Sequence, residues 1–234
     1  MRHLIALCAA CFLAAATATS TAAQERVQIQ PFDEGPRDKT FDAYRAALLQ
    51  AVVTRDIDAV LRATSPNIDL SFGGDAGRQQ LRDNLTVGPE TLSEEYRHLA
   101  PEMREEYWAE LEAVLRLGGK FQDEGTGFAA PYTFVADLPP SADQVDAFKL
   151  YFVVGSGVAL RDRPIRYGTQ LTRLNYDVVT LLDGGQGTQY RRIKLGDGTI
   201  GYAHQEYLRA NVGYRAYFVL MDGQWQMTMF LAGD

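Results

Sequence analysis

The alternation of apolar and polar residues predicts helices through most of the first half of the chain. Apolar side chains recur at helical spacing after Thr40, a residue type that caps helices well, and again after Asp56. Pro66 should end the second helix, and Asp75 should cap a third that runs through Leu85. The side chains that carry these patterns are Phe41, Tyr44, Leu48, Val52, Ile57, Val60, Leu61 and Leu81.

Two further helices and two extended segments are expected between these helices and residue 140. Ser93 to Leu99 is one predicted helix, and Pro101 should begin a longer one that ends at Gly118-Gly119. Ile68 to Phe72 alternates as a half-buried strand does, and residues 125–136 look extended, with Pro131 at an edge or bulge. Pro139-Pro140 and the residues to Gln144 make the best linker.

A basic start, a short apolar run and small residues predict that residues 1–23 are a secretory signal peptide. Leu4 to Ala18 is too short to span a bilayer, so cleavage after Ala23 is favoured over a stable membrane anchor. Cys8 and Cys11 both lie in this segment, so the mature chain would contain no disulfide and no thiolate site. The expected location is periplasmic or secreted.

The charge is unevenly distributed. Residues 24–150 contain 13 basic and 23 acidic residues, whereas residues 151–210 contain 8 basic and 5 acidic ones. An acidic body argues against nucleic acid as a partner, because that binding depends on neutralising phosphates. The mildly basic part favours an anionic ligand, or docking onto the acidic part of the same chain.

The stretch from residue 149 to 210 reads as short strands separated by turns, and its order resembles the bacterial SH3-like domain. The resemblance rests on Val158-Ala159-Leu160-Arg161, Arg163-Pro164, Leu171 to Val179, Tyr190 to Lys194, Asp197-Gly198, Gly201 to His204 and Tyr207-Leu208. It covers about a quarter of the chain. Tyr190 stands where the family usually has Trp, and Asn175 where it usually has a turn Gly. The resemblance implies a small β-barrel, with Leu160, Val178, Ile193 and Tyr202 in its core, that binds peptides or cell-wall material.

The last segment predicts a β-hairpin through Asp222-Gly223. Its first strand is apolar on both faces, which favours a place in the sheet of the N-terminal domain over an extension of the barrel. In the second strand, Trp225, Met227, Met229 and Leu231 are expected on one face. The predicted fold class is therefore α+β. Its parts are an α-rich domain at 24–148 with a small sheet, an SH3-like β-barrel at 149–210 and a hairpin at 211–234 that packs on the α-rich domain.

Five side chains of the barrel are the predicted ligand site: Arg161, Arg166, Tyr167, Tyr190 and Tyr202. Tyrosine offers a broad apolar face with a hydroxyl, and arginine pairs with carboxylates. The alternative is that the tyrosines fill the barrel or its rim and that the arginines are solvated.

Other patterns are weaker candidates for a binding or catalytic site. The glycine-rich turn at 71–77 lacks the Lys-Ser or Lys-Thr of a phosphate loop, and the glutamates of residues 102–112 have the spacing of a solvated helix face. His98 and His204 have no metal-ligand spacing, and His204 is interpreted as structural. We therefore expect no metal, no cofactor and no catalytic residue.

The favoured function is non-catalytic binding of peptidoglycan or an extended peptide by an exported protein. One alternative is a cell-wall hydrolase with a carboxylate-based N-terminal domain that the barrel targets. Another is a structural barrel docked on its own acidic domain.

Export should yield a mature protein that begins near Gln24, because the small residues before it suit signal peptidase. Intact-mass and N-terminal sequencing of the protein recovered from its native host test this. A mature chain that begins at Met1 or at Cys11 would contradict it.

Overall fold

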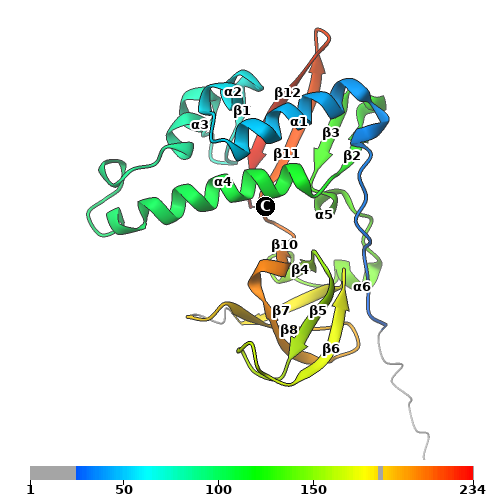
Figure 1. Cartoon of the computed structure of the whole chain (residues 1–234). Coiled ribbons are helices and arrows are strands. Elements are labelled where there is room, and N and C mark those ends of the chain that lie inside the picture. The colour runs from blue at the N-terminus through cyan, green and yellow to red at the C-terminus, as the bar shows by residue number, and fades with distance from the viewer. Residues whose placement is uncertain (1–24, 184–186, 234) are drawn as a thin grey trace, which may run out of the picture.

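The computed structural model describes residues 25–183 and 187–233. The predicted signal peptide, with Cys8 and Cys11, lies outside the described residues. The chain contains both helices and sheets, which confirms the α+β class. It forms two units, one above the other in Figure 1: a five-stranded unit with helices on its sheet, and a seven-stranded unit below it.

Four main helices cover the five-stranded unit: α1 (Lys39–Val53), α2 (Ile57–Arg62), α3 (Gly77–Leu85) and α4 (Ala100–Arg116). The cap of α1 is Asp38 rather than Thr40, because the Asp38 carboxylate accepts from the Thr40 and Phe41 amides at 2.7 and 3.2 Å. Asp56 caps α2 as predicted, through the Ala59 amide at 2.9 Å. The prediction for Asp75 is wrong, since α3 begins after Ala76 without a side-chain cap.

Three other local predictions need correction. Ser93 to Leu99 contains only a 3-10 turn, Arg97–Leu99, which leads directly into α4. Pro66 does not merely end a helix, because it lies inside strand β1 (Thr64–Asp69), at the edge of the sheet where a missing amide is tolerated. The predicted extended segment ends at Ala130, and after a cis bond to Pro131 the chain forms the short helix α5 (Tyr132–Val135).

The five-stranded sheet has the order β1-β12-β11-β3-β2. Its remaining strands are β2 (Lys120–Gln122), β3 (Gly127–Ala130), β11 (Arg215–Met221) and β12 (Gln224–Leu231). The hairpin β11–β12 therefore lies inside this sheet: β11 pairs antiparallel with β3, and β12 pairs parallel with β1. The chain leaves the unit after β3, forms the seven-stranded unit and then returns.

A bulge in β12 changes the predicted face of Met229. Tyr217 pairs with Met229 but Phe218 pairs with Met227, so Thr228 is the extra residue. One extra residue moves every later side chain to the opposite face. Phe230 consequently joins the core beneath the helices, and Met229 faces away from them.

The core of this unit lies between the helices and one sheet face, and aromatic rings fill much of it. The Phe41 ring of α1 is fully buried, 4.2 Å from the ring centre of Phe128 and 4.9 Å from that of Trp225. Phe218 lies 5.6 Å from the same ring. Because these residues come from α1, β3, β11 and β12, the returning hairpin is part of the core.

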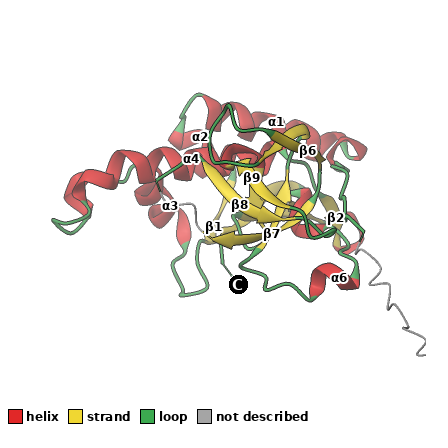
Figure 2. Ribbon diagram, turned by 90° about the horizontal axis from the view of Figure 1, so that it is seen from below, coloured by secondary structure: helices red, strands yellow, loops and turns green. Residues whose placement is uncertain are grey.

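The seven-stranded unit has the order β10-β4-β7-β8-β9-β5-β6. Its strands are β4 (Leu150–Val153), β5 (Ser156–Arg161), β6 (Gln170–Asn175), β7 (Val178–Asp183), β8 (Tyr190–Lys194), β9 (Ile200–His204) and β10 (Leu208–Ala210). The short helix α6 (Pro140–Asp143) lies in the predicted linker before it. Figure 2 views the molecule from this side, with the strands in front of the helices of the other unit.

This sheet is open, so the predicted closed barrel is wrong. Strands β6 and β10 are its two edges and do not pair with each other. Two neighbours account for the opening. Strand β10 leads within five residues into β11 of the other sheet, and residues 27–29 pair with the β6–β7 turn through Val178 N–H to Val27 O and Ile29 N–H to Tyr176 O.

The predicted barrel core is confirmed in part. Leu160 and Ile193 are fully buried in one cluster with Leu174 and Ala203. Val178 is buried in a separate small cluster beside β4, and Tyr202 is only half-buried because its side chain alternates with the buried Gly201 and Ala203.

Polar contacts tie the two units together. The Arg209 side chain is 8% exposed and donates to Glu110 of α4 at 3.1 Å and to the carbonyl of Tyr214. Burial lowers the pKa of Arg209, and Glu110 opposes this shift. At the other end of the chain, the Arg26 guanidinium donates to the buried Asp177 carboxylate at 2.7 Å, and the Glu34 amide donates to the Gly119 carbonyl. Residues 26–34 therefore bridge the two units.

Ile193→Ala should destabilise the protein by about 2–4 kcal/mol, because a fully buried side chain is removed from the seven-stranded unit. Chemical denaturation followed by circular dichroism measures the loss. Ile200→Ala is the matched control, since Ile200 is 42% exposed on the paired strand and should cost under about 1 kcal/mol. Equal losses in the two variants would contradict this core.

Deletion of residues 211–234 should abolish cooperative unfolding of the five-stranded unit. The deletion removes buried Phe218, Trp225, Met227 and Phe230, and it leaves β1 without its neighbour. The chain from Gln24 to Asp234 is the reference, and near-ultraviolet circular dichroism during denaturation is the readout. Undiminished stability of the truncated chain would show that the hairpin is dispensable.

Candidate functional site

The strongest candidate site is a cavity of about 840 Å³ on the seven-stranded unit. Four of the five predicted ligand residues line it: Arg161, Arg166, Tyr167 and Tyr190. Strands β5, β8 and β9, the loop from Asp162 to Thr169 and the turn after β9 contribute its walls. Pockets of this size are typical of small-molecule and peptide sites.

One wall of the cavity is aromatic. Tyr190 of β8 pairs directly with His204 of β9, and the two rings meet edge to face with 5.2 Å between their centres. The centre of the Tyr207 ring lies 6.3 Å from that of His204. Strands β8 and β9 and the 3-10 turn Gln205–Tyr207 therefore bring three flat rings together, an arrangement that can accept an extended backbone or a sugar ring.

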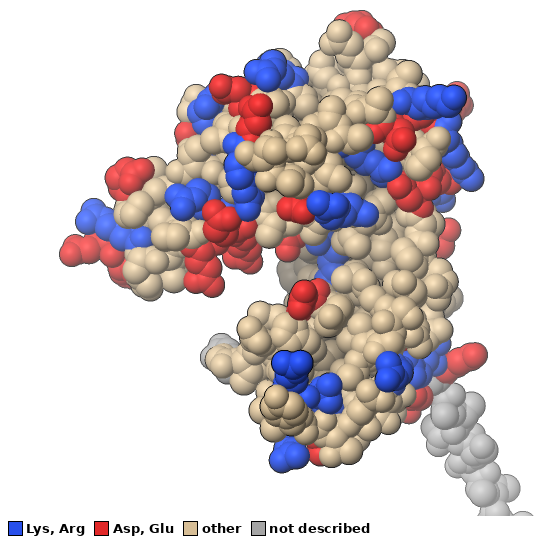
Figure 3. Space-filling model, in the orientation of Figure 1, with Lys and Arg blue, Asp and Glu red and all other residues tan. Residues whose placement is uncertain are grey.

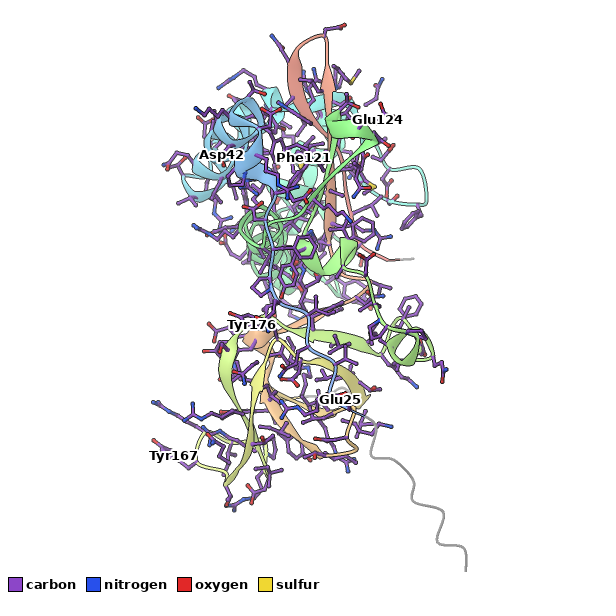
Figure 4. All side chains as sticks on the ribbon, turned by 90° about the vertical axis from the view of Figure 1, so that its right-hand side faces the viewer. Glu25, Asp42, Phe121, Glu124, Tyr167 and Tyr176 are labelled. Atoms are coloured by element: carbon purple, nitrogen blue, oxygen red, sulfur yellow. The ribbon has the colours of Figure 1, made fainter. Side chains whose placement is uncertain are left out.

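The opposite wall is the loop after β5, which Arg161 holds in place. The Arg161 guanidinium donates to the carbonyl of Gly168 at 2.8 Å, and the Asp162 amide donates to the Thr169 carbonyl. Tyr167 is 85% exposed, and Figure 4 shows it at the end of this unit farthest from the other one. The adjacent Arg166 is exposed and makes no ion pair or side-chain hydrogen bond within residues 25–183 and 187–233, so its charge is available to a ligand.

Tyr202 does not line the cavity. It lies two residues before His204 on β9, opposite Arg192 of β8 and Arg161 of β5. Sequence reasoning instead missed His204, Tyr207 and Glu206, which do line it. Strand alternation could have found His204, because residues two apart on a strand share a face.

The cavity contains charges of both signs. Arg161 and Arg166 stand on the loop side, whereas Glu206 lies at the aromatic side with a carboxylate oxygen 3.6 Å from Nδ1 of His204. In Figure 3, basic residues gather on the visible face of the seven-stranded unit, and acidic residues follow the lower edge of the α4 arm above it. The basic surface is thus most accessible to a ligand that approaches from solvent.

The other candidate motifs have structural roles. The Ser71 hydroxyl accepts from the amides of Gly73 and Asp75, so the glycine-rich turn satisfies its own backbone. Three of the five α4 glutamates have arginine partners, since Glu105 pairs with Arg55, Glu110 with Arg209 and Glu112 with Arg116. The other two, Glu102 and Glu106, are exposed on the helix surface.

No three His, Asp or Glu side chains in residues 25–183 and 187–233 gather in a way that could hold a metal ion. Within the same residues, no helix is long and apolar enough to cross a membrane. Searches of protein-family models, curated proteins and solved structures found no match to this chain.

Proposed function

We propose that this protein is an exported, non-catalytic binding protein whose seven-stranded unit is an open SH3-like module. Its ligand is an extended anionic chain, either a peptidoglycan fragment or a protein peptide. One observation carries the proposal: Arg161, Arg166 and Tyr167, from β5 and the loop after it, and Tyr190, from β8, line a single cavity.

The side chains of the cavity define how such a ligand is held. The rings of Tyr190, His204 and Tyr207 pack against apolar or sugar groups, while the hydroxyls and the imidazole donate or accept hydrogen bonds. Arg166 pairs with a ligand carboxylate, and Glu206 accepts from an amine or amide at the other side. Since these groups are solvent-exposed, each adds little energy, and the affinity should be modest.

The hydrolase alternative has less support. A carboxylate mechanism needs two acidic groups that face one substrate. Three of the five α4 glutamates each have an arginine partner, and the other two, Glu102 and Glu106, are exposed on the helix surface. The structural alternative draws on the Arg209–Glu110 contact, which joins the seven-stranded unit to the acidic helix. That contact lies at the junction of the units, and the cavity residues Arg161 and Arg166 take no part in it.

The test is a binding titration of the mature chain with soluble peptidoglycan fragments, together with an assay for released products. We expect binding without release, and an affinity that falls as salt rises because exposed charges are screened. Arg166→Ala should weaken binding by roughly three- to tenfold, as expected for one lost ion pair. Released fragments would support the hydrolase alternative.

Arg163→Ala is the matched control. Arg163 belongs to the same loop, pairs with Asp162 at 3.6 Å and does not line the cavity. Arg161→Ala tests two roles of this side chain, because it removes both a positive charge and the hydrogen bond to the Gly168 carbonyl that holds the loop. If Arg161→Ala combined with Arg166→Ala leaves binding and its salt dependence unchanged, this cavity is not the site.

A further inference from the structure

The five-stranded sheet has a second face that the helices do not cover. The register places five residues in one row across it: Asp69 of β1 pairs with Met229, Met229 with Tyr217, Tyr217 with Ala129, and Ala129 with Lys120 of β2. In each strand the adjacent residue faces the core beneath the helices, as Ile68, Phe230, Phe218, Phe128 and Phe121 do. The row therefore faces away from the helical layer.

All five residues of this row line one cavity of about 570 Å³. Phe134 and Val135 of α5 form a wall beside it, and the Arg215 guanidinium, at the start of β11, stacks 4.9 Å from the centre of the Phe134 ring. Figure 4 views the sheet nearly edge-on, with α1 and α4 on one side and the row's face on the other. The cavity is thus built from all five strands and the apolar wall of α5, and the Asp137 carboxylate adds a further charge to its lining.

The row has opposite charges at its ends and an uncharged centre. Neither Asp69 nor Lys120 makes an ion pair or a side-chain hydrogen bond within residues 25–183 and 187–233. At the centre, the Tyr217 hydroxyl donates to the Asp123 carboxylate, and burial together with that bond raises the pKa of Tyr217 to about 12. Met229, Ala129 and the Tyr217 ring therefore form a neutral, largely apolar floor.

We propose that this cavity binds an elongated small molecule with an amine at one end, an apolar middle and a carboxylate at the other. The amine pairs with Asp69 and the carboxylate with Lys120, while the middle lies on Met229 and the Tyr217 ring. Four strand spacings separate the two end residues, which is roughly 19 Å between backbones. Because side chains stand roughly perpendicular to a sheet, the two charged groups are about as far apart as the backbones, and an extended chain of about twelve carbons matches the gap.

The experiment is a calorimetric titration of the mature chain with 12-aminododecanoate, compared with dodecanoate and 1-aminododecane below their micelle concentrations. The ω-amino acid should bind about fivefold or more tighter than either single-ended probe, because each end contributes one exposed ion pair. 6-Aminohexanoate is too short to reach both ends and should bind weakest. No binding of 12-aminododecanoate, or equal binding of the three long probes, would overturn the proposal.

Two variants assign the ends. Asp69→Asn should remove the preference for 12-aminododecanoate over dodecanoate, because the amine loses its partner. Lys120→Gln should remove the preference for 12-aminododecanoate over 1-aminododecane, because the carboxylate loses its partner. The controls Glu102→Gln, on the helical layer, and Lys194→Gln, on the other sheet, should retain both preferences. If Asp69→Asn and Lys120→Gln also retain both binding preferences, Asp69 and Lys120 do not bind the two ends of the ligand. Arg166→Ala should leave these preferences unchanged, because Arg166 lines the cavity of the seven-stranded unit. The proposal for the five-stranded sheet and the proposed function are therefore tested independently.

Discussion

The pairing of β11 with β3 is the constraint on which the rest of the structure depends. These strands are neighbours in the sheet, with Ala216 opposite Ala130 and Val219 opposite Gly127, although the whole seven-stranded unit lies between them in the sequence. The pairing brings the two ends of that unit together and places Phe218 beside Phe41 and Phe128 in the core. The loop-closure entropy of the excursion must be offset by this burial. Stability of one unit is therefore linked to the other.

The polar groups that are buried at the junction between the units have hydrogen-bond or ion-pair partners. Arg209 loses most of its hydration, which only a charged partner can offset, and Glu110 is that partner. On the opposite side, residues 26–34 contact both units through Asp177 and Gly119. Tyr132, which follows the cis peptide, is buried here against Phe32, and burial raises its pKa to about 12. These ties leave the outward faces of both sheets available for ligands.

The two proposed sites use the same principle on different sheets. In the seven-stranded unit, paired strands place Tyr190 beside His204, and in the five-stranded unit they place Met229 beside Tyr217. A sheet thus assembles a binding surface from residues that are distant in sequence, while its other face is held by the core. The charges differ: arginines and a glutamate surround the first cavity, whereas the row in the second cavity has one carboxylate and one ammonium at its two ends, and Asp137 adds a second carboxylate to the lining.

The sequence by itself determined the class of fold and the local elements whose signal is a strong periodic pattern. The stripes of α1 and α4, the Asp56 cap and the Asp222-Gly223 turn are local physics, because they depend on residues within a few positions of one another. Three of the candidate ligand residues, Arg161, Arg166 and Tyr167, lie together for a similar reason, since they share β5 and the loop after it, whereas Tyr190 reaches the same cavity through the pairing of β8, β9 and β5. Only the tertiary structure decided the rest. The bulge at Thr228 reversed the faces of Met229 and Phe230. Residues 27–29 pair with the β6–β7 turn of the open seven-stranded sheet. The row from Asp69 to Lys120 arose from the register of the five-stranded sheet. Register and edge pairing depend on which strands meet, and no local pattern specifies that choice.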